Sequence, residues 1–211
     1  MRILQLNSRL TGGGTDDQCV KLAAGLCSLG QSVCLAGPDG SEFSRVARDL
    51  RVPFHATPPE GPLKLRFILS AAHLIRREHI QIVHGHHGRD IWPTLLAARL
   101  SGQRPKIVLT RHLAKSPSTW LSRRCLLSQC DALIAVSHFV AKVLREGAYE
   151  PGSPEPERRA RPPLRGDYSK IQVIHGGIDT GRFRPFDAAA QRHLAGTVAD
   201  RLAGEVECNQ R

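Results

Sequence analysis

The residues best suited to chemistry are histidines and an arginine that come at the ends of two short apolar segments. His84, His86 and His87 follow one segment, and Arg111 and His112 follow the other. An imidazole at the end of a buried strand can hydrogen-bond a ligand hydroxyl and stabilise positive charge that develops at a reacting carbon. Ligands of parallel sheets bind at such strand ends, so His112 is a candidate functional residue and the other four are candidate binding residues. A plain surface-loop histidine is the alternative reading of His112.

The density of histidines at 84–87 also raises the question of a metal. Zinc sites in proteins use histidine and cysteine ligands at short, regular spacings. No fourth ligand stands at such a spacing from these histidines, and no Cys-x-x-Cys pair occurs in the chain. We therefore expect no metal, and we expect the cluster to contact a ligand or to pack under a loop.

A glycine-rich segment is the second candidate site. Residues 7–16 contain Gly12, Gly13, Gly14 and Thr15 between an apolar segment and an amphipathic one. Consecutive glycines let backbone N–H groups approach a phosphate, and a helix N-terminus adds partial positive charge. The segment is neither a P-loop nor a G-x-G-x-x-G fingerprint. These four residues are the candidate phosphate contacts, with an ordinary strand–helix turn as the alternative.

The elements that must position these residues alternate along the chain. Apolar periodicity predicts strands at 2–7, 32–36, 52–55, 80–84, 107–110, 131–136 and 170–174, and helices at 16–29, 41–50, 63–78, 90–100, 118–128 and 138–145. The strands are short and lack polar–apolar alternation, which is typical of a parallel sheet covered on both faces. The predicted fold is an α/β, Rossmann-like, doubly wound parallel sheet of about seven strands, with ligands at the carboxyl ends of the strands.

Two segments do not fit this alternation. Residues 149–169 contain five prolines and no apolar run, which predicts a disordered, Pro/Arg-rich surface insertion. Residues 187–211 show weak helical periodicity and are expected to be an interdomain linker or a truncated tail. The domain itself is expected to span 1–186.

Four further segments resemble motifs of family 4 glycosyltransferases of the GT-B architecture. Residues 22–33 resemble LAxxLxxxGHxV, residues 82–86 resemble DIVHxH, residues 131–137 resemble ADxIIAVS, and residues 173–179 resemble VIPNGID. Gln31 stands where His is usual in the first motif, and His175-Gly176 replaces Pro-Asn in the last. The tripeptide 110–112 resembles the family's Thr-x-His, whose histidine faces the transferred sugar. The resemblance covers about residues 1–186, and the order of the motifs is more specific than any one of them.

The resemblance implies a retaining glycosyltransferase that moves a sugar from a nucleotide-sugar to an acceptor without a metal or other cofactor. It makes His112 catalytic, places Gly12, Gly13, Gly14 and Thr15 at the donor's phosphates and sugar, and places His84, His86, His87 and Arg111 on the acceptor side. In the family a C-terminal lobe grips the nucleotide with an Arg/Lys pair and a Glu-x7-Glu motif. Neither has a counterpart in these 211 residues. The chain is thus expected to be a single GT-B N-terminal lobe without the C-terminal lobe, inactive alone and completed by a possible separate C-terminal half.

Charge and composition limit the partners. The formal net charge is +11, which fits phosphorylated ligands, nucleic acid or an anionic membrane surface. Aromatic residues are only 5% of the chain and no nucleic-acid-binding motif occurs, so we expect no nucleic acid partner. The resemblance implies a nucleotide-sugar and a glycan or lipid-linked acceptor as partners, in cell-envelope glycan or lipopolysaccharide synthesis.

The location follows from the same observations. The N-terminus is too short and too polar for a secretory signal, which predicts a cytoplasmic protein with possible peripheral contact at the inner face of the membrane. The basic amphipathic segment 63–77 and Trp120 are candidates for that contact, although an amphipathic helix that simply covers the sheet gives the same pattern. The alternative function is a non-catalytic nucleotide-binding or basic interaction module. The six cysteines are expected to be reduced core thiols.

Overall fold

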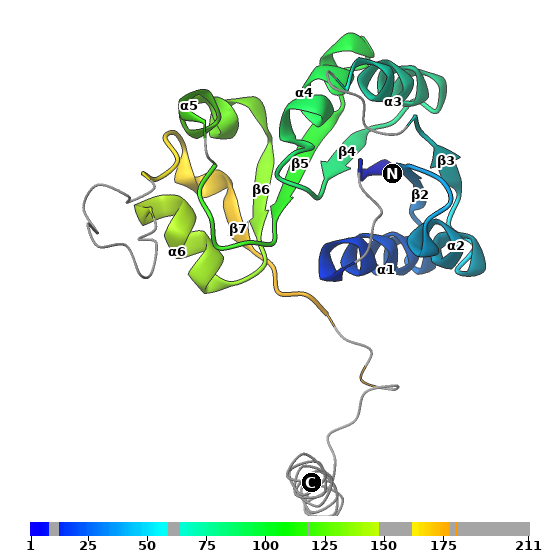
Figure 1. Ribbon diagram of the computed structural model, residues 1–211, viewed down its shortest axis with the longest axis horizontal. Helices are drawn as coiled ribbons and strands as arrows, with labels where there is room; N and C mark the ends of the chain where they lie inside the picture. The colour runs from blue at the N-terminus through cyan, green and yellow to red at the C-terminus, as the bar shows by residue number, and fades with distance from the viewer. Residues whose placement is uncertain (9–12, 59–63, 118, 148–161, 178–179, 181–211) are drawn as a thin grey trace, which may run out of the picture. The chain divides into compact units, whose positions relative to one another are not determined.

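The computed structural model describes residues 1–8, 13–58, 64–117, 119–147, 162–177 and 180. Its centre is a single sheet of seven parallel strands in the order β3-β2-β1-β4-β5-β6-β7 (Figure 1). The strand order reverses direction at β1, so that β1 pairs with β2 on one side and β4 on the other. The predicted Rossmann-like, doubly wound parallel sheet is therefore confirmed.

The elements alternate almost as the periodicity predicts. The strands are β1 Arg2–Leu6, β2 Ser32–Gly37, β3 Phe54–Ala56, β4 Ile82–Gly85, β5 Lys106–Arg111, β6 Ala132–Ala135 and β7 Ile171–Val173. The α-helices are α1 Gly14–Ser28, α2 Glu42–Asp49, α3 Leu65–Arg77, α4 Ile91–Leu100, α5 Trp120–Gln129 and α6 His138–Glu146, and a 3-10 turn, η1, spans Tyr168–Lys170. Helices α2, α5 and α6 each begin with a Ser or Thr side chain that accepts a backbone N–H, which satisfies one donor of the first turn.

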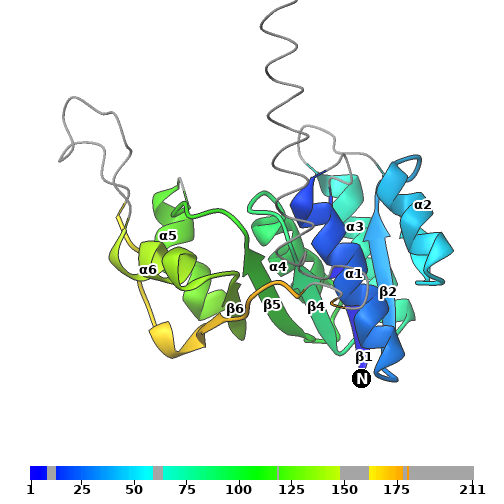
Figure 2. The same ribbon diagram turned by 90° about the horizontal axis from the view of Figure 1, so that it is seen from below.

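Helices cover both faces of the sheet. Helices α1 and α2 pack in one cluster with Ile3, Val33 and Leu35, and α3 packs with the strand residues that alternate with them, such as Leu4 and Cys34. Figure 2 shows α1 on the near side of the sheet and α3 on the far side. Because successive strand residues point to opposite faces, α1 and α2 cover one face and α3 covers the other.

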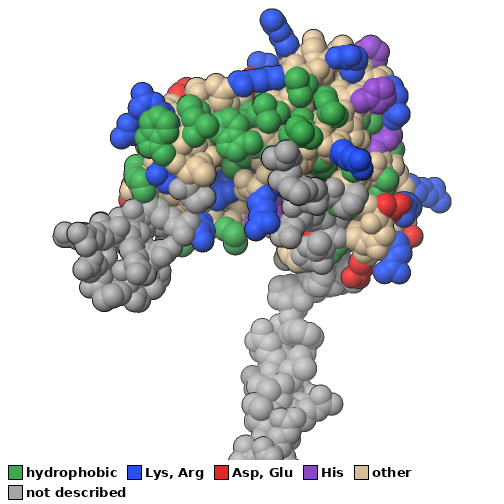
Figure 3. All heavy atoms as spheres, turned by 45° about the horizontal axis from the view of Figure 1, so that its top comes forward, with side chains coloured by type: hydrophobic (Ala, Val, Ile, Leu, Met, Phe, Trp, Pro, Cys, Tyr) green, Lys and Arg blue, Asp and Glu red, His purple; other side chains and the backbone are tan. Residues whose placement is uncertain are grey.

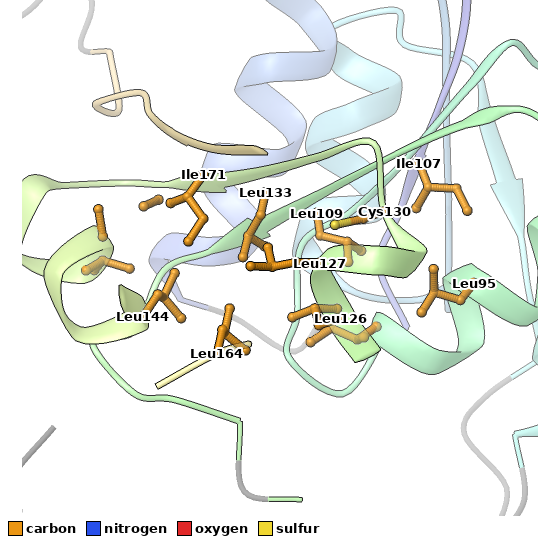
Figure 4. Packing of buried hydrophobic residues seen from close by; sticks show 14 of the residues in the cluster. Leu95, Ile107, Leu109, Leu126, Leu127, Cys130, Leu133, Leu144, Leu164 and Ile171 are labelled. Atoms are coloured by element: carbon orange, nitrogen blue, oxygen red, sulfur yellow. The ribbon is translucent and has the colours of Figure 1, made fainter. Parts of the chain in front are cut away.

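The largest buried cluster joins α4, α5 and α6 to strands β5, β6 and β7 (Figure 4). Leu109, Leu133 and Ile171 from the strands meet Leu126, Leu127 and Leu144 from the helices, and all six are almost fully buried. This cluster fixes the β5 end that carries the candidate catalytic residue.

The described end of the predicted insertion belongs to the same core. Leu164 is fully buried in the cluster, and its N–H donates to the Leu144 carbonyl at 2.9 Å. The Ser116 hydroxyl donates to the Pro162 carbonyl at 2.8 Å. A single leucine among prolines and arginines gave no apolar periodicity, so the sequence did not predict this packing. Residues 148–161 lie outside the described residues.

The chain divides into two units after Gly176, at Met1–Gly176 and Gly177–Arg211. The first unit contains every strand and helix given above. The expected boundary at 186 and the expected tail at 187–211 fall in a part of the chain that lies outside the described residues.

Candidate active site

Polar side chains from three neighbouring strands lie on one face of the sheet at its carboxyl edge. Gln5, His84 and Thr110 belong to β1, β4 and β5, and His86 and His112 follow two residues after the last two of these. Residues two apart in a strand share a face, and Ile3, two before Gln5, packs against α1. The five side chains therefore lie on the face covered by α1.

The histidines form a stacked row with protein partners. The His84 Nε2 and Thr110 Oγ1 atoms lie 2.7 Å apart, and the His86 Nε2 and Gln5 Oε1 atoms lie 2.6 Å apart. The rings of His84 and His86 have centroids 4.2 Å apart, and the rings of His86 and His112 have centroids 6.0 Å apart. The structure thus brings together three histidines that the sequence placed at two separate strand ends.

Burial keeps these imidazoles neutral. Desolvation, helped by the nearby His112, lowers the pKa of His84 to about 4, and desolvation lowers the pKa of His86 well below its usual value. Desolvation, followed by the proximity of His87 and Arg111, lowers the pKa of His112 to about 4. A neutral imidazole both donates and accepts a hydrogen bond, which suits contact with a hydroxyl at neutral pH.

Part of the hydrogen-bonding capacity in this row is unused. Among the described residues, the buried Nε2 of His112, Nδ1 of His86 and Nε2 of Gln5 have no hydrogen-bond partner. Buried polar atoms are normally paired, with protein or with ordered water, and an unpaired one costs about 1–3 kcal/mol. These atoms are the groups in the row that a bound ligand or water can satisfy.

The glycine turn stands at the start of α1, on the same face of the sheet. Gly13 has a φ of 111°, a conformation that favours glycine, and its carbonyl accepts the N–H groups of Asp16 and Asp17 at 3.1 and 3.2 Å. Helix α1 consequently begins at Gly14, two residues earlier than predicted. Gly13 and Gly14 are exposed and Thr15 is partly exposed, whereas Gly12 lies outside the described residues.

Asp16 connects the glycine turn to the histidines. This fully buried carboxylate accepts the Asn7 Nδ2 hydrogen bond at 2.8 Å, and its Oδ1 atom lies 3.0 Å from the His87 Nε2 atom. It thereby joins the end of β1, the first turn of α1 and the loop after β4. The sequence analysis did not single out Asp16, although its place in the first helical turn, where a carboxylate is stabilised, was visible.

A second buried carboxylate fixes the β1 end from the other side. Asp90, fully buried before α4, accepts the backbone N–H of Ser8 at 3.0 Å and also the Ser8 hydroxyl. The Lys64 ammonium lies 3.9 Å away. Burial raises the pKa of Asp90 from its usual value, despite the lowering effect of the Ser8 hydrogen bonds. Asp90 was predicted only as part of a helix, so its role in holding the loop was missed.

Arg111 lies on the opposite face of the sheet from His112. Its Nη1 atom lies so close to Gly88 that a Cβ there would come within 2.3 Å of it, and its Nη2 donates to the Lys115 carbonyl at 2.6 Å. Its buried Nε has no partner, and no carboxylate of the described residues lies within ion-pair distance of it. Burial lowers the pKa of this guanidinium. Arg111 is therefore a partly buried cation without a described counter-charge.

The described residues also show whether the histidine row could bind a metal ion. No group of three or more His, Cys, Asp or Glu side chains among them could hold a metal ion. The Nε2 atoms of His84, His86 and His87 are already engaged by Thr110, Gln5 and Asp16. The donor set of this row suits hydroxyl and amide partners better than a cation.

Known proteins resemble this chain in sequence pattern and in fold. A model of Glycosyltransferase Family 4 matches residues 12–152, which is more than half of the chain. No curated protein matches it significantly by sequence.

Solved structures share the fold at low identity. A glycosyltransferase from Rickettsia africae superposes with a TM-score of 0.68 at 20% identity, over 94% of this chain and 49% of that one. HepE (Alr3699) from Anabaena, solved with UDP-glucose, gives 0.63 at 14% identity, over 93% of this chain and 50% of that one. The lipopolysaccharide outer core galactosyltransferase WaaB gives 0.59 at 10% identity, over 85% and 46%. The chain spans about half the length of these proteins.

The family assignment rests on this match, because it covers the glycine turn, the three histidines of the row and strands β4 and β5, which the histidines follow. The structural likeness agrees with it at the level of the fold. The chain belongs to Glycosyltransferase Family 4, as an N-terminal domain of the GT-B architecture.

Proposed function

We propose that the chain supplies one wall of the active site of a glycosyltransferase that moves a sugar from a nucleotide-sugar to an acceptor. The observation that supports the proposal is that the glycine turn and His112 lie on the same face of the sheet, with Asp16 of the first turn of α1 3.0 Å from His87 and His87 near His112. Ligands of open parallel α/β sheets bind at this carboxyl edge. HepE, which shares the fold, was solved with UDP-glucose.

The donor's phosphates would contact the exposed backbone of Gly13 and Gly14, with Thr15 beside them. Two carboxylates, Asp16 and Asp17, already stand in the first turn of α1, where they use part of the stabilisation that the helix N-terminus offers an anion. The phosphate contact therefore rests on close backbone approach at the glycines more than on the helix dipole. Gly12 belongs to the same proposed contact.

His112 would face the transferred sugar. Its neutral imidazole, with Nε2 buried and unpaired, can hydrogen-bond a sugar hydroxyl and stabilise positive charge at the anomeric carbon. His86 and His84 stack behind it, and their hydrogen bonds to Gln5 and Thr110 hold the row in place. We place the reaction among the retaining transferases that need no metal, as the family resemblance implies.

The acceptor would lie toward the loops after β4 and β5, near His84, His86, His87 and Arg111. An uncompensated guanidinium that is partly removed from water is costly unless an anion joins it. Arg111 therefore favours an acceptor that carries a phosphate or carboxylate group. WaaB, which shares the fold, acts on lipopolysaccharide by its description, and a cell-envelope glycan or lipid-linked acceptor fits this requirement.

Completion by a second lobe is part of the proposal. The chain covers 49% and 50% of the length of two glycosyltransferases of the same fold. The Arg/Lys pair and the Glu-x7-Glu motif expected for donor binding have no counterpart in it. We expect them in a C-terminal half, and we expect the 211 residues alone to be inactive.

The location proposed for the protein is the cytoplasm, with peripheral contact at the inner face of the membrane. None of the helices in the described part of the chain has the length and apolar character needed to cross a bilayer.

The test is an assay of nucleotide-sugar turnover. The chain alone should not hydrolyse or transfer sugar from UDP-glucose or other nucleotide-sugars, and activity should appear when a donor-binding C-terminal half is supplied. His112→Ala should then abolish it. Turnover by the 211 residues alone, lost in His112→Ala, would show that the C-terminal half is not needed. Nucleotide binding without turnover by the completed protein would favour the non-catalytic module instead.

A further inference from the structure

The start of α1 carries negative charge at the place where the proposed function needs a phosphate. The net charge of the chain is +11, and Figure 3 shows Lys and Arg side chains over much of the surface in view. The first turn of α1, by contrast, holds Asp16 and Asp17 and no basic residue. These carboxylates would repel a phosphate at Gly13 and Gly14 unless nearby cations offset them.

The two carboxylates have different partners. Asp17 is partly exposed, and the Lys21 Nζ lies 2.7 Å from its Oδ2. Asp16 is only 1% exposed, and its Oδ1 lies 2.8 Å from the Asn7 Nδ2 and 3.0 Å from the His87 Nε2. A lysine is positive at neutral pH, whereas a histidine is positive only when it has bound a proton. The charge that His87 brings to the buried Asp16 therefore depends on pH.

His87 differs in its surroundings from the three histidines of the row. Burial lowers the pKa of His84, His86 and His112, so these rings stay neutral at neutral pH. The His87 side chain is 29% exposed and contacts a carboxylate, and an anion stabilises the protonated form of an imidazole beside it. His87 is therefore suited to take up a proton when a second anion, such as a phosphate, binds.

The other ring nitrogen of His87 is available to such a ligand. Its Nδ1 makes no hydrogen bond to any described residue. Because an ionised carboxylate only accepts hydrogen bonds, Nε2 donates to Asp16, and a protonated ring presents its Nδ1–H to a further acceptor.

Three more ionisable groups lie close enough to His87 to interact with its charge. His86 is its neighbour in the chain, His112 follows β5, and Asp90 precedes α4. The two neutral histidines add no charge, and an ionised Asp90 acts in the same direction as Asp16. All the described charges around the ring thus favour a proton on it.

We propose that a protonated His87 binds the diphosphate of the donor beside the glycine turn, so that binding of the nucleotide-sugar takes up a proton. Asp16 is the positioning residue: it holds Nε2, which directs Nδ1–H to a phosphate oxygen, and the same proton offsets its own charge. His87 borders both parts of the site, because the loop after β4 also lies toward the proposed acceptor. This role rests on the proposed function and adds to its donor contact a residue and a pH dependence.

The test is calorimetric titration of the full chain with UDP-glucose at pH 6 and pH 8. UDP-glucose is the probe rather than UDP, because the terminal phosphate of UDP itself titrates at about pH 6. Binding should be about five- to twentyfold weaker at pH 8, as the effect of an opposite charge on histidine protonation requires. At pH 7 the binding enthalpy should vary with the ionisation enthalpy of the buffer, with the sign of proton uptake.

Two variants separate the proton from a structural role. His87→Gln keeps an amide that can donate to Asp16 but cannot take up a proton, so it should bind UDP-glucose at pH 6 about as weakly as the wild type does at pH 8. Asp16→Asn removes the repelling charge instead, so its binding at pH 8 should be stronger than that of the wild type. A merely structural role would weaken binding in both variants at both pH values. The matched control is His73→Gln, at an exposed position of α3, which should bind as the wild type does.

A second readout in the unmodified chain does not depend on the folding of any variant. The NMR signals of the His87 ring should shift with UDP-glucose and remain unchanged with uridine, which has no phosphate. Equal affinity at pH 6 and pH 8, a pH dependence that persists in His87→Gln, or an equal His87 shift with uridine would overturn this role and leave the proposed function in place. Absence of UDP-glucose binding at both pH values would contradict the proposed function as well.

Discussion

The buried histidine row should make the stability of the domain depend on pH between 7.5 and 5.0. The pKa of His84 falls from 6.5 to about 4 on folding, and desolvation is the main cause. Between these two values the unfolded chain binds a proton that the folded chain excludes, so acid favours unfolding. The stabilisation is fully present above pH 6.5 and is lost as the pH falls toward 4.

The size of the effect follows from the two pKa values. A pKa difference of one unit corresponds to about 1.4 kcal/mol, and integration from pH 7.5 to 5.0 gives about 2 kcal/mol for His84 alone. His86, whose pKa burial also lowers, should contribute in the same direction. The pKa of His112 is also about 4, but this side chain is partly exposed, so solvent screening should make its contribution to the pH dependence smaller.

The assay is urea unfolding of the wild type and of His84→Gln at both pH values. We expect His84→Gln to be less stable than the wild type at pH 7.5, because it loses the ring contact with His86 and the hydrogen bond to Thr110. Its loss of unfolding free energy on acidification should nevertheless be smaller than that of the wild type by about 2 kcal/mol. The dependence of the free energy on urea concentration should be unchanged, so that the midpoints can be compared.

The control is His73→Gln, which replaces an exposed histidine of α3 and should leave the pH dependence as in the wild type. Equal losses of unfolding free energy on acidification in the wild type and in His84→Gln would show that burial does not exclude His84 from protonation.

Three further predictions concern packing and metal dependence. Gly85→Ala should destabilise the domain by about 1–3 kcal/mol, because its Cβ would come within 2.7 Å of the Thr94 Oγ1 atom. The control is Gly25→Ala in α1, where a Cβ would meet nothing within 4 Å and the change should be neutral or stabilising by up to about 1 kcal/mol. The urea unfolding midpoints of both variants test this. Leu164→Ala should cost about 2–5 kcal/mol in the same measurement, and Leu29→Ala, at an exposed site, should cost under about 0.5 kcal/mol. Chelation of divalent cations should leave the turnover of the completed enzyme unchanged, and loss of turnover restored by one particular metal would contradict the metal-free proposal.

The sequence predicted the fold well because the strands are buried on both faces. Continuous apolar runs such as 32–36 and 131–136 distinguish a parallel sheet from other arrangements, and the structure places strands there. The same logic failed for Leu164, because its burial depends on a backbone hydrogen bond to Leu144 and on packing in the cluster of α4, α5 and α6, which no local period reveals. It also failed for the start of α1, which the φ of Gly13 determines.

The candidate site was predicted only in part. Their position at strand ends predicted His84, His86 and His112 as site residues. It did not predict the hydrogen-bond partners of His84 and His86, because Thr110 and Gln5 lie on other strands. A signal for these partners was present: Gln5 and Asn7, His84 and His86, and Thr110 and His112 are pairs spaced by two, the period of one strand face. Asp16 and Asp90 could not be found in this way, because their roles depend on how loops from β1 and β4 meet. The same period places Arg111 and His112, which are adjacent in the chain, on opposite faces of the sheet. The sequence prediction had grouped them at one strand end.

The most direct test of the central claim is a titration of the isotopically labelled chain with UDP-glucose, followed by the backbone and histidine side-chain NMR signals. Shifts are expected at Gly13, Gly14, Thr15 and His87 and in the His112 ring, on one face of the carboxyl edge. Binding should be weaker in His112→Ala, without a change in the signals of the amino-terminal strand ends. Shifts confined to the opposite edge of the sheet, or binding that is unchanged by His112→Ala and leaves the glycine turn unperturbed, would contradict the claim.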